Sequence, residues 1–397
     1  MVQDARQADQ VRWLGAAQLL EVVRSEPGIT RAAAAQRLGI GSGGATELVA
    51  RMRRARVLDE SPAPAQGRGR PTTVLHPHAD GPLVLAADLR AADWRLALAG
   101  IDGAPRVVTQ AAYADDELQP ALNQLADAIG KIYRRKPKRL RAIGVAVAGT
   151  VSEAKLVQFT SRGWKDVDLS VLASRIPNRA GVRLLLGNDA TLAGLAEART
   201  GAARSAATAL YLMVAQGIGG ALVVNGEPLT GAHGAAGEYG HMPFGDPALV
   251  CPCGARGCWD LTVDGRALAR HRGDPPPKDP VAYVHEVLDR QHRDAPTRRA
   301  LDAVAGALGR GIGGLVNLHD PEVVTLGGVA ASLKAASPDA FDHAYRDGLM
   351  AFRKGSPPPV CDAQHGEDGP LRGAAALALD HVTTPAGLAE WVERQRN

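Results

Sequence analysis

The 397-residue sequence predicts an α/β protein that carries a small helical unit at its N-terminus. Three observations lead to this prediction. Apolar residues recur at helical spacing in residues 11–55, the pattern changes after His76 and Pro77, and short apolar strands then alternate with helical segments. Strands that alternate with helices are typical of layered α/β folds.

The composition narrows the class of protein. Apolar residues make up 45% of the chain, which is enough to bury large cores. No apolar run has the length that spans a bilayer, and the first residues show no signal-peptide pattern. We therefore expect a soluble, cytoplasmic protein without a membrane partner. The net charge of +4 is weak evidence for nucleic-acid binding, and four cysteines in such a chain favour metal ligation over disulfides.

The N-terminal segment predicts three helices. The first occupies residues 11–28, the second residues 29–40 with Thr30 as its N-cap and Gly39 at its end, and the third residues 42–55 with Ser42 as its cap. The second and third form a helix-turn-helix, in which the later helix enters the major groove of DNA. The residues expected to face base edges lie at the start of that helix: Ser42, Gly43, Gly44 and Thr46.

A β-hairpin wing is expected after these helices. Val57–Leu58 and Val74–Leu75 predict two short strands, and the loop between them places Arg68 and Arg70 at a thin cationic tip that can reach phosphates or a narrow minor groove. Two further arginines that we assign to DNA binding precede the wing, Arg51 and Arg54. The expected partner is double-stranded operator DNA. The alternative is a helical protein-interaction module with a solvated arginine face.

The rest of the chain alternates strands and helices. Residues 207–226 predict a strand, a glycine turn and a second strand. The other predicted strands are residues 81–89, 94–102, 141–149, 183–189 and 321–331, and the clearest helices are residues 120–135 and 297–319.

A loop rich in glycine and proline, residues 237–260, predicts a metal site. Its cysteines have the spacing C-x-C-x4-C, and a histidine lies ten residues before the first of them. Three thiolates and one imidazole make a closed tetrahedral zinc site, which is structural because no position is left for water. The alternative is that the cysteines are merely reduced thiols. The predicted ligands are His241, Cys251, Cys253 and Cys258, whereas Cys361 is expected to be a small core residue.

The ordered motifs resemble those of the ROK family (repressors, ORFs and sugar kinases), in its transcription-regulator branch. The resemblance covers nearly the whole chain. It rests on "GND" at 187–189, "AQGIGGA" at 215–221, "GEYGH" at 237–241, "CPCGARGCWD" at 251–260 and "DPEVVTLGG" at 320–328. The cysteine motif is the most specific of these.

This resemblance implies a winged helix-turn-helix followed by a two-lobed, actin-like fold of the sugar kinase or hexokinase type. The expected domains are residues 1–78 for DNA binding, residues 79–192 with the helix 376–397 for the first lobe, and residues 193–375 for the second lobe with the zinc loop. A homodimer or homotetramer is expected.

The resemblance also implies a carbohydrate site beside the zinc loop. Asp260 stands where the family usually has glutamate, which changes the reach of this carboxylate. Residues 159–169 resemble the loop that closes over the sugar. Plainer interpretations are that Asp189 is an N-cap and Asn188 a turn residue. The residues implied as sugar contacts are Gly149, Asn188, Asp189, Glu238, His241 and Asp260.

Phosphoryl transfer is not expected. In the family's kinases Asp189 would be the general base, but the phosphate loop Asp-x-Gly-Gly-Thr is replaced here by residues 88–93, "DLRAAD". Gln216 replaces the threonine of a second phosphate loop, although Arg90 remains a candidate phosphate ligand.

Three functions are therefore compared. The first is a sugar-responsive transcriptional repressor, located in the cytoplasm and on the nucleoid when bound to DNA. The second is an active ATP-dependent sugar kinase with a DNA-binding head. The third is a DNA-binding scaffold with a vestigial pocket.

Overall fold

The computed structural model describes residues 2–63, 73–113, 117–152, 154–159, 163–290 and 294–396. Internal contacts divide the chain into two units, each built around its own five-stranded sheet. The first unit comprises Met1–Val147, Asp168–Gly187 and Ala374–Asn397, and the second comprises Ala148–Val167 and Asn188–Gly373.

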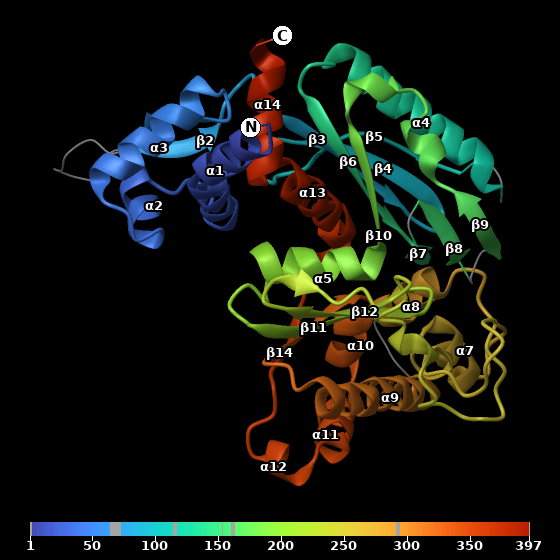
Figure 1. Ribbon diagram of the computed structural model, residues 1–397. Coiled ribbons are helices and arrows are strands. Elements are labelled where there is room, and N and C mark those ends of the chain that lie inside the picture. The colour runs from blue at the N-terminus through green and yellow to red at the C-terminus, as the bar shows by residue number, and fades with distance from the viewer. Residues whose placement is uncertain are drawn as a thin grey trace. The chain divides into compact units, whose positions relative to one another are not determined.

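The three predicted N-terminal helices are present, as α1 (Val2–Ser25), α2 (Arg31–Arg37) and α3 (Ser42–Arg54) (Figure 1). Thr30 caps α2 by accepting a hydrogen bond from the Ala33 N–H at 3.2 Å. Gly39 follows the helix with a φ of +65°, a backbone conformation that favours glycine.

The predicted cap of α3 is wrong by one residue. Gly41 is the N-cap, with extended backbone and no side-chain hydrogen bond, and its carbonyl accepts from the Ala45 N–H at 3.0 Å. Ser42 is thus the first residue of the helix. Four buried residues pack this helix into the N-terminal head, which consists of α1–α3 and the wing: Ala45, Leu48, Val49 and Met52.

The predicted wing is also present. Strands β1 (Leu58–Pro62) and β2 (Thr73–Pro77) pair antiparallel. An ion pair of 3.1 Å between Arg31 and Glu60 fixes the base of the wing to α2. The tip, with Arg68 and Arg70, lies outside the described residues.

The first unit continues with a sheet of order β10-β6-β3-β4-β5. All residues of β3 and β6 are buried, as their mainly apolar sequences predict. The two charged residues among them are paired, Asp88 with Arg95 and Arg141 with Glu390. Figure 1 shows α4 on one face of this sheet and α13 and α14 on the other. The strands are β3 (Leu83–Leu89), β4 (Asp93–Ala99), β5 (Arg106–Ala112), β6 (Leu140–Val147) and β10 (Arg183–Asn188), and the helices are α4 (Leu118–Arg135), α13 (Gly369–Val382) and α14 (Pro385–Arg396).

The second unit has a sheet of order β13-β12-β11-β14-β15. Side chains of β11 alternate between its two faces: Tyr211 packs with Ala190 and Ala193 of α5, whereas Leu210 and Leu212 join the main core with α9. The strands are β11 (Thr208–Val214), β12 (Ile218–Val224), β13 (Glu227–Pro228), β14 (Val323–Gly328) and β15 (Val360–Asp362).

The helices of this unit surround the sheet. They are α5 (Asp189–Thr200), α6 (Asp260–Val263), α7 (Gly265–Arg272), α8 (Pro280–Asp289), α9 (Ala295–His319), α10 (Ala330–Ala336), α11 (Pro338–Gly348) and α12 (Ala351–Lys354). A separate three-stranded sheet consists of β7 (Thr150–Ser152), β8 (Lys155–Phe159) and β9 (Trp164–Asp168).

Two further observations concern single predictions. Cys361 was expected in a core, but it is exposed because it lies on the edge strand β15. Among the residues described above, no helix combines the length and the apolar character that a bilayer crossing requires.

Candidate functional site

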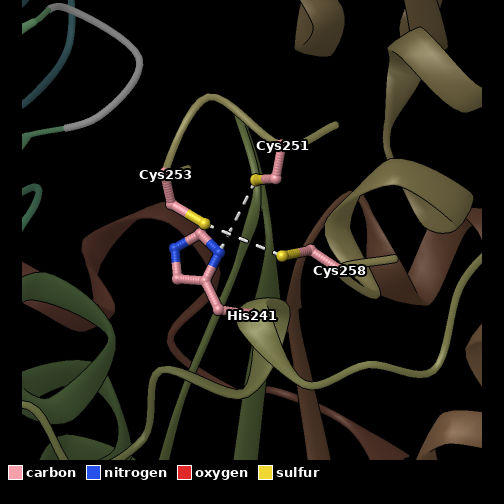
Figure 2. Close-up of side chains that lie close together, drawn as sticks. All are labelled: His241, Cys251, Cys253 and Cys258. Carbon is pink, nitrogen blue, oxygen red and sulfur yellow. Dashed lines mark hydrogen bonds between the residues drawn. The ribbon is translucent and has the colours of Figure 1, made fainter. Parts of the chain in front are cut away.

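The structure brings the four predicted metal ligands together in the loop between β13 and α6 (Figure 2). The donor atoms of these residues all lie within 4.8 Å of one another. The sulfur atoms of Cys253 and Cys258 are 3.7 Å apart, and Cys251 Sγ is 3.8 Å from His241 Nδ1. A zinc tetrahedron with Zn–S bonds of about 2.3 Å has S···S edges of about 3.8 Å, so the arrangement fits this ion.

Two glycines allow the loop to turn tightly enough to assemble the cluster. Gly254 has a φ of +99° and donates its N–H to the Cys251 carbonyl at 2.9 Å, and Gly257 has a φ of +69°. The Cys251 N–H in turn donates to the carbonyl of Ala255, which lies between the two glycines, at 2.8 Å. These contacts are local, which is why the spacing in the sequence was sufficient to predict the site.

Burial governs the charge of the thiols. It raises the pKa of Cys251, and it raises the pKa of Cys258 to about 12. Both side chains pack against Leu261. Such surroundings favour neutral thiols unless a cation stabilises the thiolates, and a bound metal ion supplies that charge.

His241 connects the cysteine cluster to an acidic side chain. Its Nδ1 faces Cys251, whereas its Nε2 lies 4.0 Å from Glu238 Oε2. The other carboxylate oxygen of Glu238, Oε1, accepts from the hydroxyl of Thr150 at 2.7 Å. Sequence reasoning missed Thr150, which directly follows Gly149 and belongs to β7.

Asn188 joins the same region through its side-chain amide. Its Nδ2 donates to the Gly149 carbonyl at 3.0 Å, and its Oδ1 accepts from the Thr191 N–H at 3.0 Å. Asn188 is thus the N-cap of α5. Asp189 is the first residue of that helix, so the plainer interpretation of Asp189 as the cap is wrong. Gly149 has a φ of +128°, and a Cβ there would lie 2.5 Å from the Gln158 carbonyl oxygen.

Asp260 lies behind the histidine and has only 7% of its surface exposed. Its Oδ1 accepts from the Ile218 N–H at 2.6 Å, and its Oδ2 is 3.7 Å from His241 Nδ1. Burial raises the pKa of this carboxyl. A Cβ on Gly240 would lie 2.0 Å from Asp260 Oδ1, so the carboxylate is closely enclosed. Asp260 links the β11–β12 turn to His241, and its contact with a carbohydrate remains a prediction.

Residues 88–93, where the resemblance implies the first phosphate loop, are held together by their own side chains and by Tyr113. Arg90 forms two hydrogen bonds with the Asp93 carboxylate, at 2.6 and 2.8 Å. The hydroxyl of Tyr113 donates to the Arg90 carbonyl at 2.6 Å. Arg90 therefore already has an anionic partner within the chain.

The turn that contains Gln216, between β11 and β12, is also held by an arginine of the chain. The carbonyl of Gln216 accepts from Arg266 Nη2 at 3.0 Å, and Arg266 also pairs with Asp264, whose side chain is fully buried. Burial raises the pKa of Asp264, and the charge of Arg266 opposes this shift.

The predicted base-reading residues are exposed at the start of α3. They are Ser42, Gly43, Gly44 and Thr46. A Cβ added to Gly43 or Gly44 would have no neighbour within 4 Å, so this surface is open to a large partner. Arg54 is exposed, and Arg51 is half-buried. Contact of these residues with DNA remains a prediction.

Comparison with known proteins identifies relatives of two kinds. The chain is 26% identical over 251 residues to a xylose repressor from Bacillus subtilis, a match that covers 62% of this chain and 63% of the repressor. A xylose repressor from Bacillus spizizenii is 30% identical, over 48% of this chain and 49% of that protein. The chain thus matches less than two thirds of each repressor. A kanosamine kinase from Amycolatopsis mediterranei is 32% identical, over 67% of this chain and 84% of the kinase.

Solved structures share the fold. A ROK family transcriptional regulator, described as a homologue of the Escherichia coli Mlc protein, matches with a TM-score of 0.73 at 19% identity and covers 96% of this chain and 99% of that chain. A ROK hexokinase from Thermus thermophilus matches with a TM-score of 0.58 at 28% identity and covers 74% of this chain and 97% of the hexokinase. The regulator therefore shares a larger part of this fold than the hexokinase does.

The model of the ROK family matches residues 85–381, which is well over half of the sequence. The chain therefore belongs to the ROK family.

Proposed function

We propose that this protein is a sugar-responsive transcriptional regulator, acting as a repressor in the cytoplasm. The observation that carries the proposal is the combination of a winged helix-turn-helix with a ROK body in one chain. The match to a ROK regulator over 96% of the chain and the similarity to xylose repressors support it. Operator DNA is the partner of the N-terminal head. A dimer or tetramer would present two heads to half-sites one helical turn apart, or a multiple of that spacing.

The proposed metal is a structural zinc ion bound by His241 and the three cysteines of residues 251–258. Four protein donors complete a tetrahedron, so the ion supplies rigidity and has no position for a reacting water. His241 would bind through Nδ1, the nitrogen that faces Cys251. Its Nε2 then remains on the side of Glu238 and can hydrogen-bond to a ligand hydroxyl.

The proposed carbohydrate site consists of residues that the zinc-bound loop holds in place. Glu238 accepts hydrogen bonds from ligand hydroxyls, and Asn188 and Asp189 at the start of α5 offer an amide and a carboxylate. Thr150 fixes Glu238, and the Gly149 carbonyl holds the amide of Asn188. Because a site that pairs hydroxyls leaves buried polar groups unmatched when a hydroxyl is missing, it selects strongly among sugars.

A response to sugar requires different affinities in two states. The ligand changes DNA binding only if it binds the DNA-competent and DNA-incompetent states unequally. We propose that the sugar favours the state that releases DNA.

Catalysis of phosphoryl transfer is not part of the proposal. Arg90 pairs with Asp93 in the segment that, by the family resemblance, corresponds to the glycine-rich phosphate loop of the kinases, and Gln216 stands where the second loop has threonine. The second candidate function is nevertheless an active sugar kinase, which the 32% identity to a kanosamine kinase favours, with Asp189 as its base. Release of ADP with a panel of hexoses tests it: turnover above about 1 s⁻¹ would favour the kinase.

The deciding experiment is capture of genomic DNA fragments by the zinc-loaded protein, with and without candidate sugars. We expect a few fragments to be enriched and one sugar to release them. Gly44→Asp places a negative charge on the exposed start of α3 without a steric clash, and it should abolish capture. Gly355→Asp, at a position that is also open, is the matched control. If no fragment is enriched, or if both variants behave alike, the regulator hypothesis is wrong.

A further inference from the structure

A cavity of about 750 Å³ lies in the first unit, where several segments of the chain meet. Most of its lining comes from the end of α3, the residues just before β6, and α14, and Trp13 of α1 and Asp80 complete it. None of its lining residues belongs to the zinc cluster or to the carbohydrate residues. Its volume is within the range of small-molecule sites, about 300–1,000 Å³. Six of the lining side chains are cationic: Arg51, Arg54, Arg56, Lys138, Arg139 and Arg394.

Three of these cations have no carboxylate partner among the described residues, whereas Arg394 pairs with Glu390 of the same helix. Asp80 and Glu393 are the two carboxylates among the residues that line the cavity. No ion pair joins Arg54, Arg56 or Lys138 to a carboxylate within the described part of the chain. Like charges that lie close together raise the free energy of the folded state, unless a bound anion offsets their repulsion.

The other cations add to the positive potential. Arg139 donates from Nε to the Gly81 carbonyl at 2.9 Å, a neutral acceptor that leaves its charge in place. Nearby, burial and then the positive charge of Arg394 lower the pKa of Arg141, and Glu390, which pairs with both arginines, opposes this shift.

The favourable interaction of arginines with a helix dipole explains only some of the cationic side chains that line the cavity. Arginines in the last turn of a helix favourably face its negative end, which accounts for Arg51 and Arg54 on α3. Arg56 lies beyond that helix, with a φ of +53°, and Lys138 and Arg139 come from a different segment. Cations from separate segments converge on one space, which indicates a ligand.

Rigid backbone and aromatic groups define the walls. The indole of Trp391, on α14, donates to the Ala55 carbonyl at the end of α3 at 2.8 Å. Trp391 and Trp13, which both line the cavity, are 2% and 5% exposed. The cations are thus presented by a framework that exists before a ligand binds.

We propose that this cavity binds a small phosphate-bearing anion. Guanidinium groups match phosphate oxygens through paired N–H donors, and a lysine adds a compact charge. Since residues of the head and of the body line the same cavity, the anion fixes the head on the body. The site is thus a second input to the protein, and it goes beyond the proposed carbohydrate response.

Thermal unfolding of the full, zinc-loaded chain in pyrophosphate tests the proposal, with ionic strength held constant by chloride. We expect a saturable rise in the unfolding temperature. Arg54→Ala and Lys138→Ala, both on exposed side chains, should each raise the half-saturating concentration at least about tenfold. Arg135→Ala removes the same charge from the exposed surface of α4 and should leave the response unchanged.

Two results would overturn the proposal. One is the absence of a saturable response in the unsubstituted protein. The other is an equal response in Arg54→Ala and Arg135→Ala. Binding of a short DNA duplex distinguishes the sources of phosphate: if pyrophosphate has no saturable effect while Arg54→Ala and Lys138→Ala weaken duplex binding, the cations belong to a DNA surface and not to a small-molecule site.

Discussion

The hydroxyl of Thr150 donates a 2.7 Å hydrogen bond to Oε1 of Glu238 and so joins strand β7 to the loop that carries the cysteine cluster. Glu238 faces His241 Nε2 through its other oxygen, and His241 Nδ1 faces Cys251. On the other side of Thr150, the Gly149 carbonyl accepts from Asn188. A continuous series of contacts therefore runs from the cap of α5 to the predicted metal ligands.

Replacing Thr150 with valine tests this relationship. Thr150→Val keeps the shape of the side chain but removes the donor, so Glu238 is no longer held and carbohydrate affinity should fall by about tenfold. Isothermal titration with the sugar found in the DNA-release assay measures this. Thr109→Val, on strand β5, is the matched control and should bind as the unsubstituted protein does. Equal affinities in the two variants would remove Thr150 from the site.

Loss of one thiolate should remove the metal and the carbohydrate response together. Cys253→Ser leaves three donors, so we expect zinc content to fall from about one ion per chain to a small fraction of that. Elemental analysis and sugar titration measure the two effects, while DNA binding reports that the head remains folded. Cys361→Ser, at an exposed thiol outside the cluster, should change neither. Sugar binding that persists in metal-free protein would contradict the proposed role of the ion.

The wing tip should contribute to DNA affinity through charge. Arg68→Ala combined with Arg70→Ala should weaken binding to all sequences and reduce the slope of log K against log salt by about two. Fluorescence anisotropy at several salt concentrations measures that slope. The pair Arg134→Ala and Arg135→Ala, at the end of α4, provides the same charge change elsewhere. A slope that does not change in the wing variant would place the tip outside the DNA interface.

Close packing of α13 on the first sheet should make Gly144 intolerant of a side chain. A Cβ on Gly144 would lie 1.9 Å from the Ala374 carbonyl oxygen, so Gly144→Ala should lower the free energy of unfolding by about 1–3 kcal/mol. Gly355→Ala meets no atom within 4 Å and has a negative φ, which makes it the control. Chemical denaturation compares the two, and similar midpoints would argue against the packing of α13 on β6.

The order of the elements was predictable because their signals are local. Thr30 precedes α2 and Gly39 follows its end, as the sequence indicates. The strand, turn and strand predicted for residues 207–226 are present as β11 and β12. The cap of α3 was displaced by one residue because Gly41 can supply the extended conformation without a side-chain bond. The edge strand β5 was not predicted, since most of its residues are exposed and it lacks a buried apolar run.

The candidate site was only partly predictable. The approach of His241 and the three cysteines follows from their spacing in the sequence, whereas Thr150 and Glu238 are 88 residues apart and no pattern in either segment predicts their contact. The Arg90–Asp93 pair was also missed, because each residue was considered for its charge and not as the partner of the other. Cys361 was misplaced for a related reason: burial depends on the neighbouring strands, and β15 has none on one side.

All four donors of the metal cluster fall between His241 and Cys258, so no distant part of the polypeptide has to arrive before the ion can be captured. Closing so short a stretch costs little chain entropy compared with assembling a sheet from segments far apart. If the proposed zinc ion binds here, the loop can take it up while the remainder of the polypeptide is still being synthesised. The supply of zinc during growth would then limit how many new molecules acquire the proposed carbohydrate site.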